Sequence, residues 1–572
     1  MHGTEGFPFP RPVEYDARAL MQEKFRTSRF RPLAALLVAG ALLVAGCKSR
    51  EDPPAAAETA APGEPRRGGT VVTGWTAEPG GVNELTDPSS QVSNEMLYRI
   101  FLHLFEEQPD FQDHPPTFAP SLVESHEWSA DHKTLTLHLR DVVWSDGVPV
   151  TAADVRWTWQ AQIHPDVVWD NADSKRWIKD VEVVDPRTVR FHFSRVYAKQ
   201  ILDVNEGVIL PKHAWEKLPF AEWRKNGEWF KQNLVVDGPF TVDSWEPQQQ
   251  IVLKRNGRYY EPGLPRLDRV VMRQIADQAA GFTQILNGEL DFLPQIAPTD
   301  VARVKGNPDL ELLEVWFNLY VGVAWNNQRP LFSDPEVRRA LTLAIDRQTI
   351  VDTVLGEYGR VATSPIMTMV WAHDRSIEPW PYDPAEAGRI LAAKGWQDTD
   401  GDGVLDRGGK PFAFELITNT GNQLRTDATV MIQNQLKKVG IRAQPRPLEF
   451  NTLISQMLAG TYDAAMAGYS LDTSLDMTTT FHSRSTADGG NSMRYQNPEM
   501  DRLLETAASQ PDLPAMEPYL KQIQQILHRE QPITFLWESK RMTAVNKRVK
   551  DVKPTATFAF FNLKEWWVGP ER

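Results

Sequence analysis

The sequence predicts an α/β protein built from more than one domain. Its 572 residues, 41% hydrophobic and 24% charged, have the composition of a globular protein and are too many for a single core. Residues 412–469 alternate between strand and helix patterns, whereas residues 117–205 repeat their hydrophobic residues every second position. The first pattern predicts a parallel βαβαβ unit and the second a β-meander.

The N-terminal residues have the pattern of an export signal. A basic stretch, Lys24 to Arg31, precedes an apolar run of 14 residues, Leu33 to Gly46, and then Cys47. That run is too short to span a bilayer as a helix, which takes about 20 residues. The order of basic, apolar and small residues before a cysteine resembles bacterial lipoprotein signals, which implies a diacylglyceryl group on Cys47. The alternative is a buried free cysteine in a cytosolic protein.

Residues 1–46 are therefore predicted to be a signal peptide with an N-terminal extension, because Met21 stands where such a signal normally begins. Residues 47–67 hold the lipidated cysteine and an Ala/Pro-rich, charged stretch that predicts an extended spacer. The formal net charge of −13 argues against nucleic acid and against electrostatic adhesion to anionic lipid. Cys47 is the only cysteine, so no internal disulfide is expected.

The first half of the body reads mainly as strands. Residues 68–75 predict a short buried strand that opens the first domain. Within residues 117–205, Leu135, Leu137 and Leu139 alternate with polar residues, and a turn at Asp185-Pro186-Arg187 separates two further alternating runs. A helical insert opens at Thr151, which can cap it, with Asp154 near its positive end.

The second half carries clearer helix signals. Asp334 and Pro335 begin an amphipathic helix, and a second helix runs from Asp383-Pro384 to Gly395. The βαβαβ unit follows as strand Phe412–Thr418, helix Asp427–Val439, strand Ile441–Gln444, helix Asn451–Leu458 and strand Ala464–Tyr469. Ligands bind outside the carboxyl ends of such strands, where Asn419 and residues 469–472 lie.

Catalytic motifs are hard to find. His126-Glu127 would need a histidine at position 130 to form a zinc helix, and that residue is Ala130. The sequence has no G-x-S-x-G elbow and no Walker loop, and its 12 histidines lack ligand spacing. We therefore predict a binding protein that is not an enzyme and requires no cofactor.

One segment resembles a calcium loop. Residues 398–409 place carboxylates at positions 1, 3, 5 and 9 of an EF-hand-like loop, with Gly403 at position 6, but Gly409 stands where the bidentate glutamate belongs. Two interpretations stay open: a structural calcium site and an Asp/Gly-rich turn. The predicted calcium ligands are Asp398, Asp400, Asp402, Val404 and Asp406.

Most of the 19 tryptophans lie in amphipathic stretches that predict packing in the core. Trp75 and Trp325 differ, because each follows or ends an apolar strand-like run. We expect these two side chains to face a ligand cleft.

Several blocks together resemble the family 5 extracellular solute-binding proteins, the peptide-binding components of ABC importers. They are LTLHLRDVVWSDGVPVTAADVRWTW, VDGPFTVDSWEPQQQIVLKRNGRYY, LNGELDF, AWNNQRPLFSDPEVRRALTLAIDR and LKKVGIRAQ, in the family's order. The resemblance covers essentially the whole chain after the spacer. It implies a two-lobed fold of the large (cluster C-like) periplasmic-binding-protein type II class, with an extra inserted domain and a hinge formed by chain crossings near Trp316 and Trp537.

The implied boundaries divide the first lobe into three segments. They are residues 68–115, 206–317 and 537–572 for the first lobe, 116–205 for the inserted domain and 318–536 for the second lobe.

The resemblance also implies a ligand site. In peptide-binding relatives, a Trp, two small residues and an Asp follow the last strand of the βαβαβ unit, and the Asp receives the peptide's α-ammonium group. Here the residues are Tyr469-Ser470-Leu471-Asp472, and a second Asp of the family pattern comes one residue late, at Asp476. Asp472 also fits an Asx-type turn residue. Ligand binding is predicted for Asp472, Tyr469, Asn419, Trp75 and Trp325.

The function implied is a monomeric, membrane-tethered extracytoplasmic protein that captures oligopeptides or dipeptides between its lobes and delivers them to an ABC permease. A protein of the same fold that binds nickel, haem or an oligosaccharide is the first alternative, because the residues around Asp472 depart from the family pattern. An extracytoplasmic hydrolase is the third possible function, after these two binding functions.

Overall fold

The structure is a computed structural model, and it describes residues 64–87, 90–487 and 490–569. The predicted signal, the Cys47 lipidation site and most of the predicted spacer lie outside these residues. Among the described helices, none is long and apolar enough to cross a membrane.

The part predicted as the first lobe, taken together with the region predicted as the inserted domain, covers residues 64–317 and 537–569 of the described chain and is called the first lobe below. Strand β1 pairs in parallel with β10 and β11, β9 pairs antiparallel with β10, and β8 pairs antiparallel with β9 at the edge of the sheet. The strands of this part are β1 (Thr70–Trp75), β8 (Phe240–Glu246), β9 (Gln250–Arg255), β10 (Arg269–Gln274), β11 (Phe292–Leu293), β20 (Val549–Lys550) and β21 (Trp567–Val568). The helices are α1 (Gln91–Ile100), α4 (Lys212–Trp215), α5 (Gly227–Gln232), α6 (Gln278–Leu286) and α7 (Val301–Lys305).

The region predicted as the inserted domain holds a separate four-stranded sheet in the order β4-β5-β7-β6. Its elements are β4 (Val123–Trp128), β5 (Thr134–Leu139), α2 (Ala152–Gln162), β6 (Ile178–Asp185), β7 (Thr188–Phe193) and α3 (Gln200–Asn205), preceded by the pair β2 (Phe105–Glu107) and β3 (Phe118–Pro120). The predicted strands and helix are confirmed, but the predicted meander, in which each strand pairs with the next one in the chain, is wrong. After α2 the chain enters at the edge strand β6, so β7 lies between β5 and β6.

The second lobe, residues 318–536, contains the predicted βαβαβ unit. It consists of β16 (Ala413–Asn419), α11 (Gln423–Lys437), β17 (Arg442–Leu448), α12 (Phe450–Ala459) and β18 (Ala464–Tyr469). The three strands are parallel in the order β17-β16-β18, as predicted. Helix α11 begins four residues before its predicted start, because the Asn422 side chain accepts a hydrogen bond from the Arg425 backbone N–H. Gly460 ends α12 in the left-handed conformation, with φ 67°.

Helices and short strands surround this unit. They are α8 (Pro335–Leu343), α9 (Arg347–Val354), β13 (Gly359–Val361), α10 (Pro384–Ala393), β14 (Asp406–Arg407), β15 (Lys410–Pro411), α13 (Thr478–Phe481), α14 (Pro498–Ala508) and α15 (Leu513–Glu530). The predicted helix starts at Asp334 and Asp383 are confirmed, since both side chains accept backbone N–H groups in the first turn.

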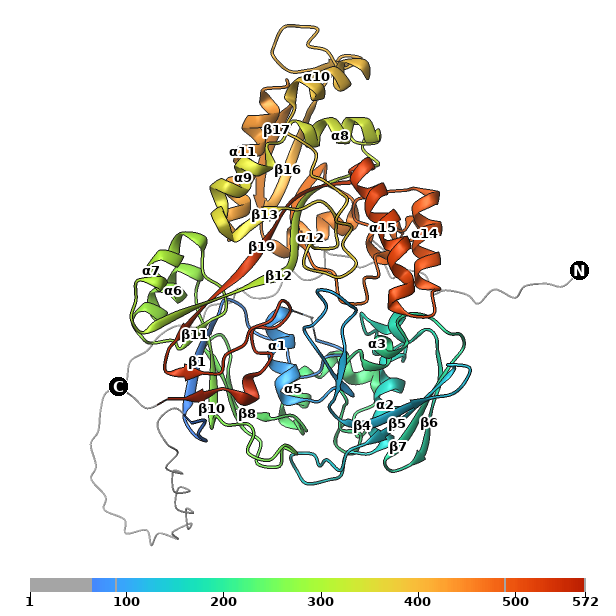
Figure 1. Cartoon of the computed structure of the whole chain (residues 1–572), viewed down its shortest axis with the longest axis vertical. Coiled ribbons are helices and arrows are strands. Elements are labelled where there is room, and N and C mark those ends of the chain that lie inside the picture. The colour runs from blue at the N-terminus through green and yellow to red at the C-terminus, as the bar shows by residue number, and fades with distance from the viewer. Residues whose placement is uncertain (1–63, 88–89, 488–489, 570–572) are drawn as a thin grey trace, which may run out of the picture. The chain divides into compact units, whose positions relative to one another are not determined.

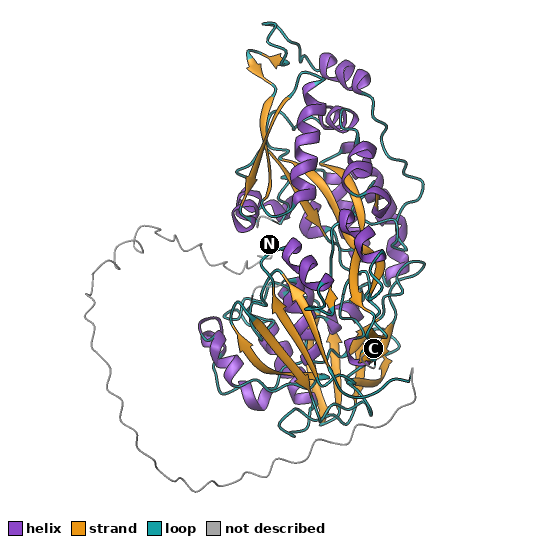
Figure 2. Cartoon of the chain, turned by 90° about the vertical axis from the view of Figure 1, so that its left-hand side faces the viewer, coloured by secondary structure: helices purple, strands orange, loops and turns teal. Residues whose placement is uncertain are grey.

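Two long strands join the lobes. β12 (Leu310–Trp325) and β19 (Ile533–Asn546) pair antiparallel along most of their length and connect the sheets of both lobes into one. In Figure 1 they run from the region of β11 to the region of β13 and β16, and Figure 2 shows the strands of both parts from the side. Their pairing shifts register between Trp316 and Tyr320. The crossings expected near Trp316 and Trp537 therefore lie inside two continuous strands.

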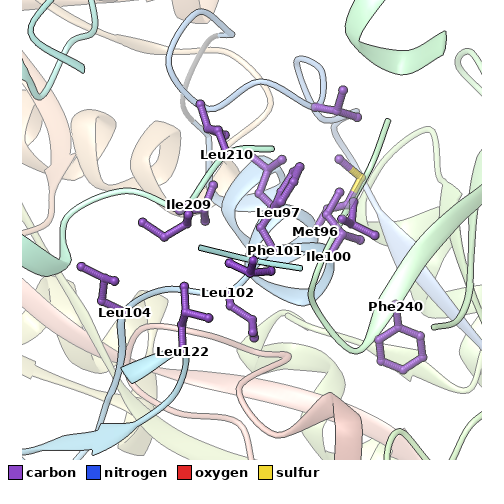
Figure 3. Packing of buried hydrophobic residues seen from close by; sticks show 14 of the residues in the cluster. Met96, Leu97, Ile100, Phe101, Leu102, Leu104, Leu122, Ile209, Leu210 and Phe240 are labelled. Atoms are coloured by element: carbon purple, nitrogen blue, oxygen red, sulfur yellow. The ribbon is translucent and has the colours of Figure 1, made fainter. Parts of the chain in front are cut away.

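Each lobe has its own hydrophobic core. In the first lobe, Met96, Leu97 and Ile100 of α1 pack against residues that are distant in sequence, including Leu210 and Phe240 (Figure 3). The second lobe holds two clusters, one on each side of β12 and β18. Because the apolar contacts within each lobe are extensive, we expect each lobe to be rigid where it lines the space between them.

A candidate ligand cavity between the lobes

A cavity of about 290 Å³ lies between the two lobes. The first lobe contributes the end of α1, strand β2, the residues around α3 and the segment 555–564. The second lobe contributes Asn318 at the hinge and the loop after β18, with Asp472, Thr473 and Ser474. The cavity therefore lies where ligands bind in open α/β sheets, beyond the carboxyl end of a parallel strand.

Asp472 lines this cavity, as predicted from the position of β18. Its Oδ1 accepts a hydrogen bond from the Ser474 backbone N–H at 3.0 Å and another from the Ser474 hydroxyl. The residue is thus an Asx-type turn residue and a cavity residue at once. Its Oδ2 receives no hydrogen bond from the described part of the chain, so this oxygen is available to a ligand.

Asn318 holds the Asp472 loop in place. Its Nδ2 donates to the Leu471 carbonyl at 2.6 Å, and its backbone N–H donates to the Ala556 carbonyl at 3.1 Å. The side chain is 8% exposed, and its Oδ1 has no hydrogen-bond partner among residues 64–87, 90–487 and 490–569. A single residue at the hinge thus connects the β18 loop to the C-terminal segment of the first lobe.

Two of the first-lobe carboxylates that line the cavity, Glu107 and Glu206, are influenced by the charge of Asp472. Burial raises the pKa of Glu107 to about 7, and the negative charges of Asp472, Glu206 and Asp110 raise it further, against a hydrogen bond from the Thr473 side chain. Burial also raises the pKa of Glu206, while Lys175 opposes the rise and Asn171 Nδ2 donates to Glu206 Oε1 at 2.7 Å. Two first-lobe acids therefore lie within electrostatic reach of the second-lobe acid.

Lys199 forms an ion pair between the lobes. Its Nζ lies 2.8 Å from Asp476 Oδ2 and 4.0 Å from Asp203 Oδ1. Burial acts to raise the pKa of Asp476, but the Lys199 ammonium outweighs it and holds the pKa at about 2. This pair closes one side of the cavity.

A second set of charges lies on the side of the C-terminal segment. Lys564 Nζ is 2.7 Å from Glu261 and 3.3 Å from Glu106. Arg99 donates from Nη1 to the Phe561 carbonyl at 2.7 Å. The positive charge of Lys564 is thus neutralised by these two carboxylates, whereas the guanidinium of Arg99 donates to a backbone carbonyl.

Tyr469 and Asn419 lie at the predicted strand ends but are not among the residues that line the cavity. Tyr469 stacks on Tyr320, with 5.4 Å between ring centroids, and burial raises the pKa of its phenol. Asn419 Oδ1 accepts from Arg425 Nη1 at 2.9 Å. The expectation that they bind ligand directly is not supported, because the chain runs on for three residues after β18 ends at Tyr469 before it reaches the cavity at Asp472.

The expectation for Trp75 and Trp325 is wrong. Trp325 is 0% exposed, and its indole N–H donates to Thr534 Oγ1 at 3.0 Å within the second-lobe core. Trp75 is 7% exposed and donates to Thr73 Oγ1, with its ring edge-on to Phe560. An apolar strand that ends in tryptophan has the same pattern whether the ring packs in a core or faces a cleft.

The loop predicted to bind calcium is assembled only in part. Asp398, Asp400 and Asp402 are exposed and offer carboxylate oxygens within 4.8 Å of one another. The Asp398 oxygens accept the backbone N–H groups of Gly401 and Gly403, whereas Asp406 accepts hydrogen bonds from Thr399. Asp406 is therefore not part of the cluster of three carboxylates, and the contacts are those of an Asp/Gly turn. The part of Val404 stays a prediction. Calcium on the three carboxylates stays a prediction, which the melting temperature in a chelator tests.

No sequence pattern identified four residues that line the cavity: Glu107, Glu206, Lys199 and Asn318. Glu107 lies in a three-residue strand and Lys199 just before α3, so neither has a local signal for a ligand site. Only the folding of two lobes against each other brings them to Asp472.

Together, the two lobes, their paired connecting strands and the charged cavity between them define a protein of the two-lobed ligand-binding class. The family model described as bacterial extracellular solute-binding proteins, family 5 middle region, matches residues 117–491. The chain therefore belongs to the family 5 extracellular solute-binding proteins.

Its relatives include peptide-binding proteins. The oligopeptide-binding protein AppA of Bacillus subtilis (strain 168) is 32% identical over 555 residues, which cover 96% of this chain and 100% of AppA. The di/tripeptide-binding protein 1 of Pseudomonas aeruginosa (strain UCBPP-PA14) is 26% identical over 474 residues, 78% of this chain and 85% of the relative.

Solved structures show the same fold. AppA from Bacillus subtilis in complex with a nonapeptide matches with a TM-score of 0.79 and 30% identity, over 89% of this chain and 100% of that one. NikZ from Campylobacter jejuni in complex with Ni(L-His) matches with a TM-score of 0.77 and 23% identity, over 87% of this chain and 99% of that one. The second similarity shows the fold alone.

Proposed function

We propose that this solute-binding protein captures peptides in the cavity between its lobes and delivers them to an ABC permease. The observation that carries the proposal is the placement of Asp472. Its carboxylate lines an interlobe cavity at the end of β18, with Oδ2 left for a ligand. A carboxylate in such a place binds an ammonium group through charge-assisted hydrogen bonds worth about 1.5 to 3 kcal/mol each. The peptide ligand of the related AppA structure supports the choice of solute.

Native mass spectrometry of the purified body, residues 64–572, tests the class of solute. A closed cleft retains its ligand, so we expect a mixed population of short peptides that dissociates on denaturation. A bound nickel complex, haem or oligosaccharide would contradict the proposal and favour the corresponding alternative.

Substitution of Asp472 tests the site. We expect Asp472→Ala to weaken peptide binding about tenfold or more, because one charge-assisted pair is lost. Titration calorimetry measures the change, and Asp400→Ala, in the exposed turn of the second lobe, serves as the control for loss of one carboxylate. An affinity equal to that of the control would exclude Asp472 from the ligand site.

The tether is the second part of the proposal. We expect Cys47 to carry the lipid that holds the protein at a bacterial membrane, on the basis of the residues before it. The change Cys47→Ser should move the protein from the membrane fraction to the soluble fraction of cells while peptide binding is retained. Membrane association that survives this change would require another anchor.

A further inference from the structure

The cavity contains more negative charge than its own cations neutralise. Among the carboxylates that line it, Glu106 is paired with Lys564 and Asp203 lies 4.0 Å from Lys199. Glu107, Glu206 and Asp472 form no ion pair within 4.0 Å in the part of the chain that the structure describes. The two lysines of the lining, Lys199 and Lys564, are already engaged by other acids.

These three unpaired carboxylates lie around the same part of the cavity. Thr473, the neighbour of Asp472, lines the cavity together with Glu107 and Glu206. The charge of Asp472 also acts on both Glu107 and Glu206. Glu107 and Glu206 are thus the first-lobe counterparts of the second-lobe residue proposed to receive the ligand's ammonium group.

Asn318 gives an independent indication of what the site lacks. This buried side chain lines the same cavity, and its Oδ1 is an acceptor that finds no donor in residues 64–87, 90–487 and 490–569. Asn318 also holds the Asp472 loop through the Leu471 carbonyl. Two acceptors without donors in the described residues, Asn318 Oδ1 and Asp472 Oδ2, therefore lie where one end of the ligand is proposed to bind.

Enclosing these three carboxylates, of which Glu206 has the buried cation Lys175 nearby, is costly, because their mutual repulsion strengthens as water leaves the cleft. The α-ammonium group of a peptide offsets one charge. We propose that Glu107 and Glu206 form a second cation subsite beside Asp472, so that the protein prefers peptides whose first residue is lysine or arginine. This inference rests on the proposed peptide-binding function.

Two peptides that differ in the charge of the first side chain test the preference for a cationic first residue. Lys-Ala-Ala-Ala and norleucine-Ala-Ala-Ala have nearly the same shape and differ by one positive charge. We expect calorimetry on the wild-type protein to show about tenfold tighter binding of the lysine peptide, the value of one charge-assisted contact. Ala-Ala-Ala-Lys, which carries the charge at the far end, should bind like the norleucine peptide.

Variants then assign the preference to the subsite. Glu107→Gln keeps the shape of the side chain and should reduce the preference for the lysine peptide to about twofold or less. Glu261→Gln is the matched control, because this acid is paired with Lys564 and does not line the cavity, so the preference should persist. Melting temperatures confirm that both variants are folded.

The outcomes separate the two proposals. Equal binding of the lysine and norleucine peptides by the wild type, or an unchanged preference in Glu107→Gln, overturns the second subsite while peptide binding stands. Failure of all three peptides to bind overturns the peptide proposal and the inference together.

Discussion

Glu107, like Asp203, is a cavity residue whose charge responds to pH near neutrality. Its carboxyl lies in β2, faces Asp472 and Glu206, and has Thr473 and Asp110 as its other polar neighbours. Burial is the main reason that its pKa is raised to about 7. Without a ligand, the group is protonated below this pH and charged above it.

Binding of a cationic side chain should therefore be linked to a proton. A cation beside Glu107 favours the carboxylate, so the pKa falls in the complex and a proton is released on binding at neutral pH. We expect the affinity for Lys-Ala-Ala-Ala to rise between pH 5.5 and pH 7, where the peptide's α-ammonium group stays protonated, by at most about tenfold per pH unit for a single released proton. Calorimetry at several pH values measures the rise.

The Glu107→Gln variant supplies the control for this pH dependence, because glutamine does not titrate. Its affinity for the same peptide should change little over that range. A wild-type affinity that stays constant or falls as the pH rises would remove Glu107 from the site.

At the scale of single elements, the start of α2 depends on one buried acid. Asp154 is 4% exposed, and its Oδ2 accepts from the backbone N–H and the hydroxyl of Thr151 at 2.8 and 2.9 Å. Its Oδ1 accepts from the backbone N–H of Lys212, the first residue of α4, at 3.0 Å. This side chain thus caps one helix and fixes the segment that leads into another.

Loss of Asp154 should destabilise the fold. Asp154→Ala leaves buried donors without acceptors, which costs about 1 to 3 kcal/mol in the free energy of unfolding. Urea denaturation measures this loss. Asp173→Ala, a change at an exposed acid of the same region, should alter the free energy by less than about 0.5 kcal/mol. Equal stabilities for the two variants would contradict the role of Asp154.

At the scale of the whole molecule, side chains of the first lobe hold the second lobe across the cavity. Phe111 is 2% exposed and belongs to the hydrophobic cluster of the second lobe, together with Ala198 and Leu202. The Phe111 carbonyl accepts the Trp371 backbone N–H at 3.0 Å. The Lys199–Asp476 pair adds a polar contact. Separation of the lobes would expose the Phe111 ring, so the ring favours the closed state.

Truncation of Phe111 should favour the open state and so weaken binding. We expect Phe111→Ala to lower peptide affinity about tenfold and to increase the radius of gyration of the ligand-free protein in small-angle scattering. The control is Phe450→Ala, since this ring on α12 is 53% exposed. A scattering curve and an affinity that match the control would show that Phe111 does not hold the lobes together.

The local elements were predicted well because their signals lie within a few residues. The caps Asp334 and Asp383 and the alternation around Leu135 and Leu137 each specify one turn or one strand. The order of strands β5, β7 and β6 was not predictable in the same way. Alternation shows which face of a strand is buried, but it does not show which strand will be its neighbour.

The sequence by itself determined the α/β class, the parallel βαβαβ unit, the family and the position of Asp472 at the end of a strand. These follow from periodicity, capping and motif order, which are local properties of the chain. Only the tertiary structure decided that Trp75 and Trp325 are core residues and that Glu107, Glu206 and Lys199 join Asp472 at one cavity. The physical reason is that a cleft between lobes is formed by segments hundreds of residues apart, and its charge balance exists only once the lobes have packed together.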